Sequence, residues 1–557
     1  MVTFEQGRIA GNELFEVEHQ RLSRLVSDMD RLREGATVEE LAGEAPPCLE
    51  RWQLAQRPAP CLMGLSFGHP LLPGIGRPII TSGLVLLTTD GSWARTVSRW
   101  YRLGTPADPE SASKGYALFL NSFVLCGGLV YGKGLFETRR KQDVLEVAPW
   151  SAEMAEFVTR ESCQFEGFRF AAEMNTSPTA TNPLAGMHGY VAAQTTIFPH
   201  PKRSWESVPR NKHQDPIFMV TTGSVTVPNY VLRKAGLRAL QSHTIGAVLV
   251  EVDHQDRVFV RTIDCDPDTG EFWDLDIHVG RGEVRLAADV RAQRGLPGPV
   301  LGLGCIHRDK LNAACARAVW GLGGMPEGDI PLIDAIQSSH QVFNDLLDSG
   351  SISHHERHNP WTQVQKTVAG MKSIQGEIAR VADFIAETER PWCETHVVYS
   401  NHDDHLARWL RDTDWREDPV NARFYLRANL AMVEAIHEQR EFDVFEWAIR
   451  NANPSARFTV TDVDEPLVFF RTSYQYHGDR GVNGARGTTA GLTRLGIPIT
   501  KAHDHTGTWR DGVISAFSLL DYPDYAKGPS TWGRGATIEH PDGSRQMVPF
   551  VGDKYRA

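Results

Sequence analysis

The sequence lacks the features that mark secreted, membrane-spanning or disulfide-stapled proteins. Its eight cysteines are scattered over 557 residues without a CxxC pair, which argues against a zinc ribbon and a disulfide framework. The first residues are partly acidic and contain no apolar signal-peptide core. The longest apolar runs, 79–89 and 122–131, are too short to span a bilayer. These absences predict a reduced, cytoplasmic protein without a membrane span.

The sequence also has fewer basic than acidic residues. The chain has 58 Lys and Arg against 69 Asp and Glu, for a net charge of -11. This balance argues against a surface coated with phosphate-binding side chains. It leaves room for a local basic groove, or for a metal site that supplies the positive charge itself. The length exceeds what a single hydrophobic core supports, so we expect at least two domains.

The spacing of apolar residues and the positions of Gly and Pro divide the chain into three predicted parts. Apolar residues at helical spacing predict a helix over 12–34, and residues 36–52 weakly resemble a helix-turn-helix, for which a plain helical hairpin is the better interpretation. The segment 246–263 alternates apolar and polar residues around a polar turn, which predicts a β-hairpin. Gly and Pro at 291–300 predict a domain boundary. We therefore predict a helical segment at 1–60, an α+β domain at 61–295 and an α/β domain at 296–557.

The second half carries most of the candidate functional residues. It alternates short apolar runs with helical stretches at 361–389 and 421–449, which indicates a layered α/β domain. Four of its five polar clusters directly follow an apolar run, as functional residues do at the carboxyl ends of strands. The clusters are CIHRD with Cys305, His307 and Asp309; NDLLD with Asn344, Asp345 and Asp348, followed by His354 and His355; SNHD with Asn401, His402 and Asp403; HGDRGVNGARG with His477, Arg480 and Arg486; and AHDH with His503 and His505.

These residue types point to a pair of metal ions. Imidazole and carboxylate together suit manganese, iron or zinc. A two-metal centre holds its ions roughly 3.5–4 Å apart, and one bridging carboxylate is needed between them. A histidine beside the ions that binds neither of them can protonate a leaving oxygen. The clusters therefore predict a two-metal centre for hydrolysis of a phosphate ester.

The order of the clusters resembles the calcineurin-like metallophosphoesterase superfamily. That family's motifs run D-x-H, G-D-x-x-D, G-N-H-D/E, H and G-H-x-H along the chain. The counterparts here are C-I-H (305–307), N-D-L-L-D (344–348), S-N-H-D (400–403), His477 and A-H-D-H (502–505). The resemblance implies a four-layer α/β sandwich of two mixed β-sheets flanked by helices. It also implies two divalent ions, with Mn²⁺ as the first choice and Mg²⁺, Fe²⁺ or Zn²⁺ as alternatives.

The same resemblance implies a role for each motif residue. The implied ligands of the first metal are Cys305, His307, Asp345 and His505. The implied ligands of the second metal are Asp345, Asn401, His477 and His503, so Asp345 bridges the two ions. His402 would face the leaving group as the catalytic histidine, and Asp403 would orient it.

Cys305 departs from the family pattern, because the first motif has Asp at this place. A thiolate can bind manganese or zinc, but it is a softer ligand than a carboxylate. Three alternatives stay open: Asp309 compensates, the first metal binds more weakly, or Cys305 is a structural buried thiol with Asp309 or water at the metal position.

The residues expected to touch substrate are less sharply defined. His354 and His355 would contact the substrate phosphate or lie in a solvated loop. Arg480 and Arg486 would bind phosphate oxygens or belong to a tight loop that only positions His477.

A narrower resemblance concerns phage proteins. The runs FNDLLDSGSISHHERHNP and YHGDRGVNGARG are similar to those of phage proteins related to the first-step DNA-transfer nuclease of tequintavirus-type phages, over roughly 165–557. This resemblance implies an early phage protein with metal-dependent DNase activity, acting on DNA in the host cytoplasm. A homo-oligomer and a second phage transfer protein are left open as partners.

Two other functions compete with the nuclease. A phosphomonoesterase or protein phosphatase is favoured by the negative net charge. A degenerate metallophosphoesterase that serves as a DNA-transfer scaffold is favoured by the altered first motif.

Overall fold

The fold is mixed α/β, as predicted, and is built from several sheets and helices. The described residues of this computed structural model are 2–4, 13–37, 40–41, 62–67, 75–80, 84–98, 100–104, 115–119, 162–165, 167–174, 176–212, 214, 216–224, 228, 230, 233–280, 283–353, 356, 359–522 and 527–557. The chain divides into two compact units, Met1–Ala112 and Ser113–Ala557. Among the described helices, none is both long and apolar enough to cross a membrane.

In the described residues of the first unit, helix α1 accompanies two small sheets. Helix α1 (Glu13–Arg33) confirms the helix predicted over 12–34. The four-stranded sheet has the order β1 (Val2–Phe4), β4 (Leu84–Thr88), β5 (Trp93–Thr96), β6 (Trp100–Arg102), and β2 (Met63–Phe67) pairs with β3 (Ile75–Ile80). Most of the predicted hairpin at 36–52 and the apolar run at 122–131 lie outside the described residues.

A six-stranded sheet forms the centre of the second unit. Its order is β21 (Thr459–Thr461), β20 (Glu394–Val398), β19 (His340–Asn344), β18 (Val300–Cys305), β27 (Gly535–Glu539), β28 (Arg545–Pro549). The first four strands are parallel, and β27 and β28 are antiparallel to their neighbours. Every residue of β18 is buried, as expected for a parallel strand with both faces covered.

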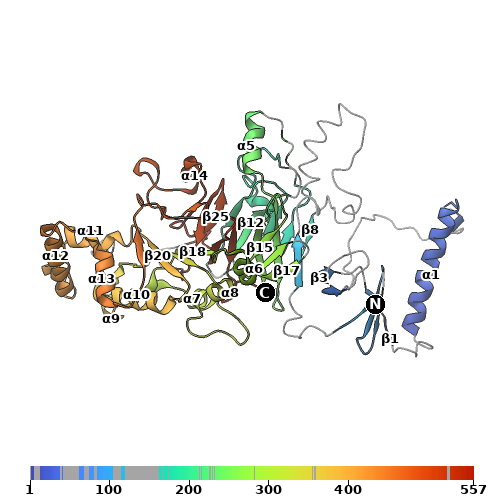
Figure 1. Ribbon diagram of the computed structural model, residues 1–557, viewed down its shortest axis with the longest axis horizontal. Coiled ribbons are helices and arrows are strands. Elements are labelled where there is room, and N and C mark those ends of the chain that lie inside the picture. The colour runs from blue at the N-terminus through green and yellow to red at the C-terminus, as the bar shows by residue number, and fades with distance from the viewer. Residues whose placement is uncertain are drawn as a thin grey trace. The chain divides into compact units, whose positions relative to one another are not determined.

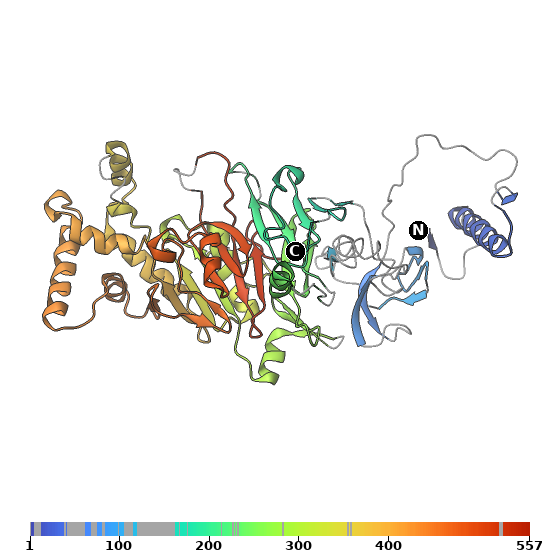
Figure 2. The ribbon, with the colours of Figure 1, turned by 90° about the horizontal axis from the view of Figure 1, so that it is seen from above.

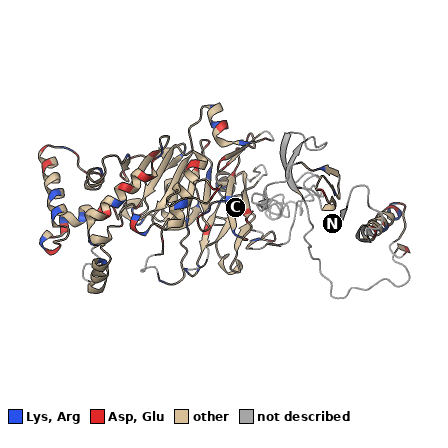
Figure 3. Ribbon diagram, turned by 90° about the horizontal axis from the view of Figure 1, so that it is seen from below, with Lys and Arg blue, Asp and Glu red and all other residues tan. Residues whose placement is uncertain are grey.

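Helices pack on one face of this sheet (Figure 1). The helices of this part are α7 (Ala313–Trp320), α8 (Leu332–Ile336), α9 (Pro360–Val368), α10 (Ile374–Thr388), α11 (Asp404–Asp412), α12 (Ala422–His437) and α13 (Val444–Ala452). Their buried side chains, such as Val319 and Phe384, share one hydrophobic core with Phe343 of β19. Acidic and basic residues are interspersed along the helices (Figure 3).

A ten-stranded sheet lies against the other face of the six-stranded sheet, where β26 packs on β18 and β27 (Figure 2). Its order is β22 (Val468–Phe469), β23 (Thr472–Ser473), β24 (Ile499–Lys501), β26 (Val513–Phe517), β25 (Thr506–Arg510), β11 (Trp205–Val208), β12 (Ile217–Thr221), β10 (Thr195–Phe198), β9 (Phe168–Phe170), β8 (Cys163–Gln164). The sheet is mixed, and α14 (Thr489–Leu492) packs on β25 and β26.

The rest of the second unit is built around the predicted hairpin, which the structure confirms as β13 (Gly246–Val252) and β14 (Val258–Asp264). Strand β7 (Gly115–Phe119) pairs with β13, and β14 packs on β28. The remaining elements are α5 (Lys234–Ser242), β15 (Phe272–Asp274), β16 (Ile277–Gly280), β17 (Glu283–Leu286) and α6 (Ala287–Arg294).

The predicted boundary between 295 and 296 falls inside the second unit. Helix α6 ends there at Gly295, whose φ of 64° lies in the left-handed region that favours glycine. Strands from both sides of this point nevertheless share the ten-stranded sheet, because β11 pairs with β25 through Trp205 and Trp509. The two predicted domains are therefore joined by backbone hydrogen bonding within one sheet.

Candidate metal centre

The predicted clusters meet where the two large sheets face each other. Cys305 is the last residue of β18, Asp345 directly follows β19, and Asn401 follows β20, so all three lie at the carboxyl ends of parallel strands. His503 comes from the other sheet, between β24 and β25. Its backbone N–H donates to Cys305 Sγ over 3.2 Å, which joins the two sheets at the site.

Two groups of ligand atoms share Asp345. In each group the ligand atoms all lie within 4.8 Å of one another. The first group is Cys305, His307, Asp345 and His505, and the second is Asp345, His477 and His503. These are the His, Cys and Asp residues that the sequence assigned to the first and the second metal.

The backbone at the site is held in an uncommon conformation. His307, Asp345, His503 and His505 have φ values of 39°, 49°, 70° and 60°, in the left-handed region that non-glycine residues rarely adopt. Such positions carry a conformational cost, and they concentrate at functional sites, where the surroundings hold them in place. Four of them on ligand residues indicate that the fold maintains this arrangement against a local preference.

The residues fit a pair of divalent ions. Asp345 Oδ1, Asn401 Oδ1, His477 Nε2 and His505 Nδ1 are buried and have no hydrogen-bond partner among the described residues. Buried polar atoms are almost always paired, and bound ions would satisfy these four atoms together. Nitrogen, oxygen and sulfur donors together suit manganese, iron or zinc.

Residues behind the ligands orient the imidazole rings. His307 Nδ1 lies 2.9 Å from Asp348 Oδ1, so its N–H donates to that carboxylate and Nε2 faces Asp345. His477 Nδ1 lies 3.2 Å from the side-chain oxygen of Asn344 in the same manner. Metal-binding histidines are typically fixed by such outer hydrogen bonds. Sequence reasoning placed Asp348 and Asn344 in the motif but assigned them no role.

Burial and neighbouring charges together set the ionisation of the site residues. Burial alone would raise the pKa of Asp345, but His477 and His307 hold it well below its ordinary value, so the carboxylate is ionised. Burial would lower the pKa of His307, and the carboxylates of Asp345 and Asp348 instead raise it to about 9. Burial lowers the pKa of His505 to about 3, which leaves a neutral ring able to bind a metal.

Cys305 is a buried thiol at the centre of the first group. Burial and the adjacent Asp345 carboxylate raise its pKa well above the ordinary value. Asp309, the alternative ligand, lies outside both groups because Arg380 of α10 binds its carboxylate through two nitrogens, one of them 2.6 Å away. Of the two residues, Cys305 is therefore the one that belongs to a group able to hold a metal ion.

His402 lies beside the ligand groups. Its ring centroid is 4.4 Å from that of His307, and Nδ1 lies 3.2 Å from the backbone oxygen of Asp348. Asp403 accepts hydrogen bonds from Ser400 Oγ (2.8 Å) and from the backbone N–H of Leu347 (3.2 Å). The direct partner of the His402 ring is thus the Asp348 carbonyl, and Asp403 fixes the loop that carries the ring.

The remaining predicted residues lie at the rim or outside the described chain. Arg486 lies 3.4 Å from Asp504, and Arg480 lies 3.6 Å from Asp479; both arginine side chains are more than half exposed. His354 and His355 lie outside the described residues.

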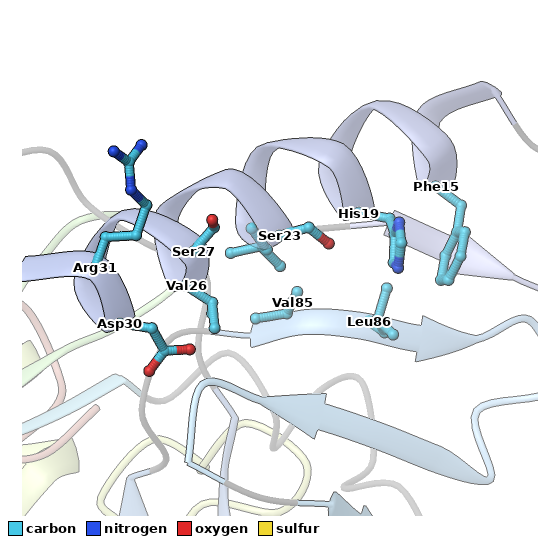
Figure 4. Close-up of a pocket in the computed structure, with 10 residues that line it drawn as sticks. Phe15, His19, Ser23, Val26, Ser27, Asp30, Arg31, Val85 and Leu86 are labelled. Carbon is cyan, nitrogen blue, oxygen red and sulfur yellow. The ribbon is translucent and has the colours of Figure 1, made fainter. Parts of the chain in front are cut away.

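A separate cavity of about 600 Å³ belongs to the first unit. It lies between α1 and β4, with Phe15 and His19 on the helix and Leu86 on the strand (Figure 4). None of the predicted site residues lines it.

Fold and site together define a mixed α/β protein with a buried, histidine-rich candidate metal centre. Over 457 residues the chain is 30% identical to Protein A1 of Escherichia phage T5, and the alignment covers 79% of each chain. The chain therefore belongs to the family of this phage protein, which confirms the predicted resemblance to proteins of tequintavirus-type phages. Residues 23–123 match the model of a family of unknown function, DUF6634. No solved structure matches the chain.

Proposed function

We propose that this chain is a metal-dependent phosphodiesterase of the calcineurin-like metallophosphoesterase type that hydrolyses DNA, as an early phage protein for DNA transfer or host-DNA degradation. The observation that carries the proposal is the pair of buried ligand groups that share Asp345. The packing of two mixed sheets, with helices beyond the six-stranded one and α14 on β25 and β26, supports the same fold type. Membership in the phage family supports the biological setting.

In the proposed reaction, bound ions and side chains of the protein would have separate roles. Two divalent ions would polarise the phosphate and lower the pKa of an attacking water. Asp345, ionised and common to both groups, would hold both ions. Asp348 keeps His307 in the tautomer that points Nε2 at Asp345.

His402 is the residue that we assign to the departing oxygen. It lies outside the two groups that share Asp345. It forms a further group with His307 and Asp348, but His307 and Lys310 already bind the carboxylate of Asp348. The Asp348 carbonyl accepts a hydrogen bond from its Nδ1–H, which leaves Nε2 for proton transfer. Burial lowers the pKa of His402, and an arriving phosphate would raise it again by adding negative charge nearby. A ring protonated at Nε2 would give that proton to the departing oxygen.

Attraction for DNA would come from the centre rather than from the overall charge. The net charge is -11, and both signs are interspersed along the helices (Figure 3). Two divalent ions would place concentrated positive charge at the scissile phosphate. Arg480 and Arg486 are the exposed cations of the neighbouring loop, so they are the candidates for adjacent phosphates.

Plasmid nicking in Mn²⁺, measured beside metal content, tests the proposal. We expect His402→Ala to lower nicking by about 10²-fold or more while the protein keeps its metal. Asp345→Ala should lose both metal and nicking, and His437→Ala, at the end of α12, should lose neither. Wild-type turnover in His402→Ala would refute the role of that residue. Unchanged nicking and metal content in Asp345→Ala would refute the proposal itself.

A second candidate function is a DNA-transfer scaffold without hydrolytic activity. The observation that favours it is the buried Cys305 thiol, whose pKa is raised well above its ordinary value, in a position where the family motif has a carboxylate. Fewer than one ion per purified chain, together with no nicking, would favour the scaffold. Turnover of para-nitrophenyl phosphate without plasmid nicking would instead favour a phosphomonoesterase.

A further inference from the structure

A second histidine cluster lies at the amino ends of the parallel strands. His340 is the first residue of β19, and Glu394 and His396 are the first and third residues of the neighbouring β20. The register pairs His340 with Glu394. Asp345 follows the last residue of β19, so the cluster and the candidate metal centre lie at opposite ends of one strand, about 16 Å apart at the usual rise of a strand.

The three side chains converge on one point. His340 Nδ1 lies 3.1 Å from His396 Nε2, and Glu394 Oε2 lies 3.6 Å from the first of these atoms and 3.8 Å from the second. Metal–ligand bonds of about 2.0–2.2 Å separate neighbouring ligand atoms by about 3–3.6 Å. One ion therefore reaches all three atoms with shifts of a few tenths of an ångström.

The two rings are held in place from behind. His396 Nδ1 lies 2.9 Å from Thr459 Oγ1 of β21, which leaves Nε2 directed at the cluster. The ring of Phe469 stacks on His340 with centroids 4.3 Å apart. His396 is therefore oriented through its outer nitrogen, as metal-binding histidines typically are, whereas His340 is held by the stacked ring.

The three side chains differ in solvent exposure, and the difference suits an ion with an open coordination position. The His396 side chain is 11% exposed and that of His340 24%, whereas the Glu394 side chain is 75% exposed. Two imidazoles would thus anchor the ion at the sheet, while its outer side faces water. Two histidines with one carboxylate and an open position form a donor set typical of Zn²⁺ and of non-haem Fe²⁺.

We propose that His340, Glu394 and His396 form a mononuclear site for a divalent transition metal, separate from the centre around Asp345. The ion ties β19 to β20 at the edge where these strands begin. This site does not depend on the proposed nuclease function, because none of its residues belongs to the other ligand groups.

Cobalt titration of the full-length, chelator-treated protein tests this site. The Asp345→Ala protein removes the shared ligand of the other centre, so it serves as the background. We expect Asp345→Ala to bind one Co²⁺ or Zn²⁺ per chain more than the double variant Asp345→Ala/His396→Ala does. Bound Co²⁺ should give Asp345→Ala a visible absorption band that the double variant lacks. Addition of Zn²⁺ should raise the melting temperature of the first protein and not that of the second.

Glu394→Gln gives a milder version of the same test. Its side chain is mostly exposed, so the single variant in the wild-type chain should fold and nick plasmid as the wild type does. In the Asp345→Ala background we expect metal affinity at the new site to be weakened about 10-fold or more. His437→Ala in the same background should leave the titration unchanged. Identical stoichiometry and identical Co²⁺ spectra in the background protein, Glu394→Gln and His396→Ala would overturn the proposal, and the two imidazoles would then form only a hydrogen-bonded pair.

Discussion

Cys305 is the residue at which this chain parts from the metallophosphoesterase motif. Its sulfur accepts a hydrogen bond from His503 and lies among three other ligand residues. Because its pKa is raised by burial and by Asp345, the thiol carries its proton when no metal is bound. A metal that binds there must displace that proton, which weakens binding relative to a carboxylate that is already ionised.

We therefore predict that Cys305→Asp raises the affinity for Mn²⁺ by on the order of 10-fold, since a hard cation prefers carboxylate oxygen to sulfur. Equilibrium dialysis with Mn²⁺ measures this change, and the nicking rate at low Mn²⁺ should rise with it. Cys315→Ser, at a buried cysteine of α7 outside the ligand groups, is the matched control. An unchanged or lower affinity in Cys305→Asp would show that the thiol position does not face the ion.

Glu539 is a second buried titratable residue, on β27 of the six-stranded sheet. The backbone N–H of Arg471 donates to Oε1, whereas Oε2 has no hydrogen-bond partner among the described residues. Burial raises the pKa of Glu539 to about 7, from an ordinary value of 4.5. The folded protein therefore holds the proton more tightly than the unfolded chain does. Its contribution to stability is complete below about pH 4.5 and is lost as the pH rises through about 7.

Because the folded protein holds this proton more tightly, we predict that Glu539→Gln is more stable than the wild type at pH 8, by about 3 kcal/mol. The advantage should disappear near pH 4.5, where both side chains are neutral in the folded protein. Urea unfolding at the two pH values measures the difference. Glu434→Gln, on the exposed side of α12, should match the wild type at both. An equal offset at pH 4.5 and pH 8 would contradict the assigned titration.

Among the elements, β18 determines how closely the two large sheets approach. A Cβ atom at Gly304 would lie 1.7 Å from the backbone oxygen of Phe517 on β26. The absence of a side chain there lets β18 and β26 pack together, and it places Cys305 within reach of His503. Gly304 of VLGLGC thus serves the contact between the sheets.

We predict that Gly304→Ala destabilises the protein by about 3 kcal/mol or more, because the opposing atom belongs to the backbone and cannot rotate away. The same substitution should weaken metal binding by moving the two sheets apart. Gly189→Ala is the control, since nothing lies within 4 Å of its added Cβ. Urea unfolding measures the first effect and metal content the second; wild-type values for both would contradict this account of the packing.

Local elements were the part of the fold that the sequence could predict. The helix over 12–34 and the hairpin at 246–263 depend on nearby residues, and both are present. The helical stretch at 361–389 is divided into α9 and α10, because Gly370 adopts a φ of 68° and Ser373 caps the start of α10. The stretch at 421–449 is divided likewise into α12 and α13.

On the scale of the whole molecule, strand pairing was the part that single-sequence reasoning could not supply. The sequence did predict that the residues around Asp345 form one site, because the order of their motifs resembles that of a known family. The roles of Asp348 and Asn344, and the His340 cluster, depend on strand register and on contacts between sheets. Nothing in a local pattern reveals that strands on either side of residue 295 belong to one sheet.

The contact between His503 and Cys305 joins residues 198 positions apart in the chain. At ribosomal rates of about 5–20 residues per second, roughly 10–40 s pass between the synthesis of the two. During that interval Cys305, His307 and Asp345 exist without His503 and His505, so neither ligand group is complete. A nascent chain therefore cannot assemble the centre until the strands that carry its last histidines have been made.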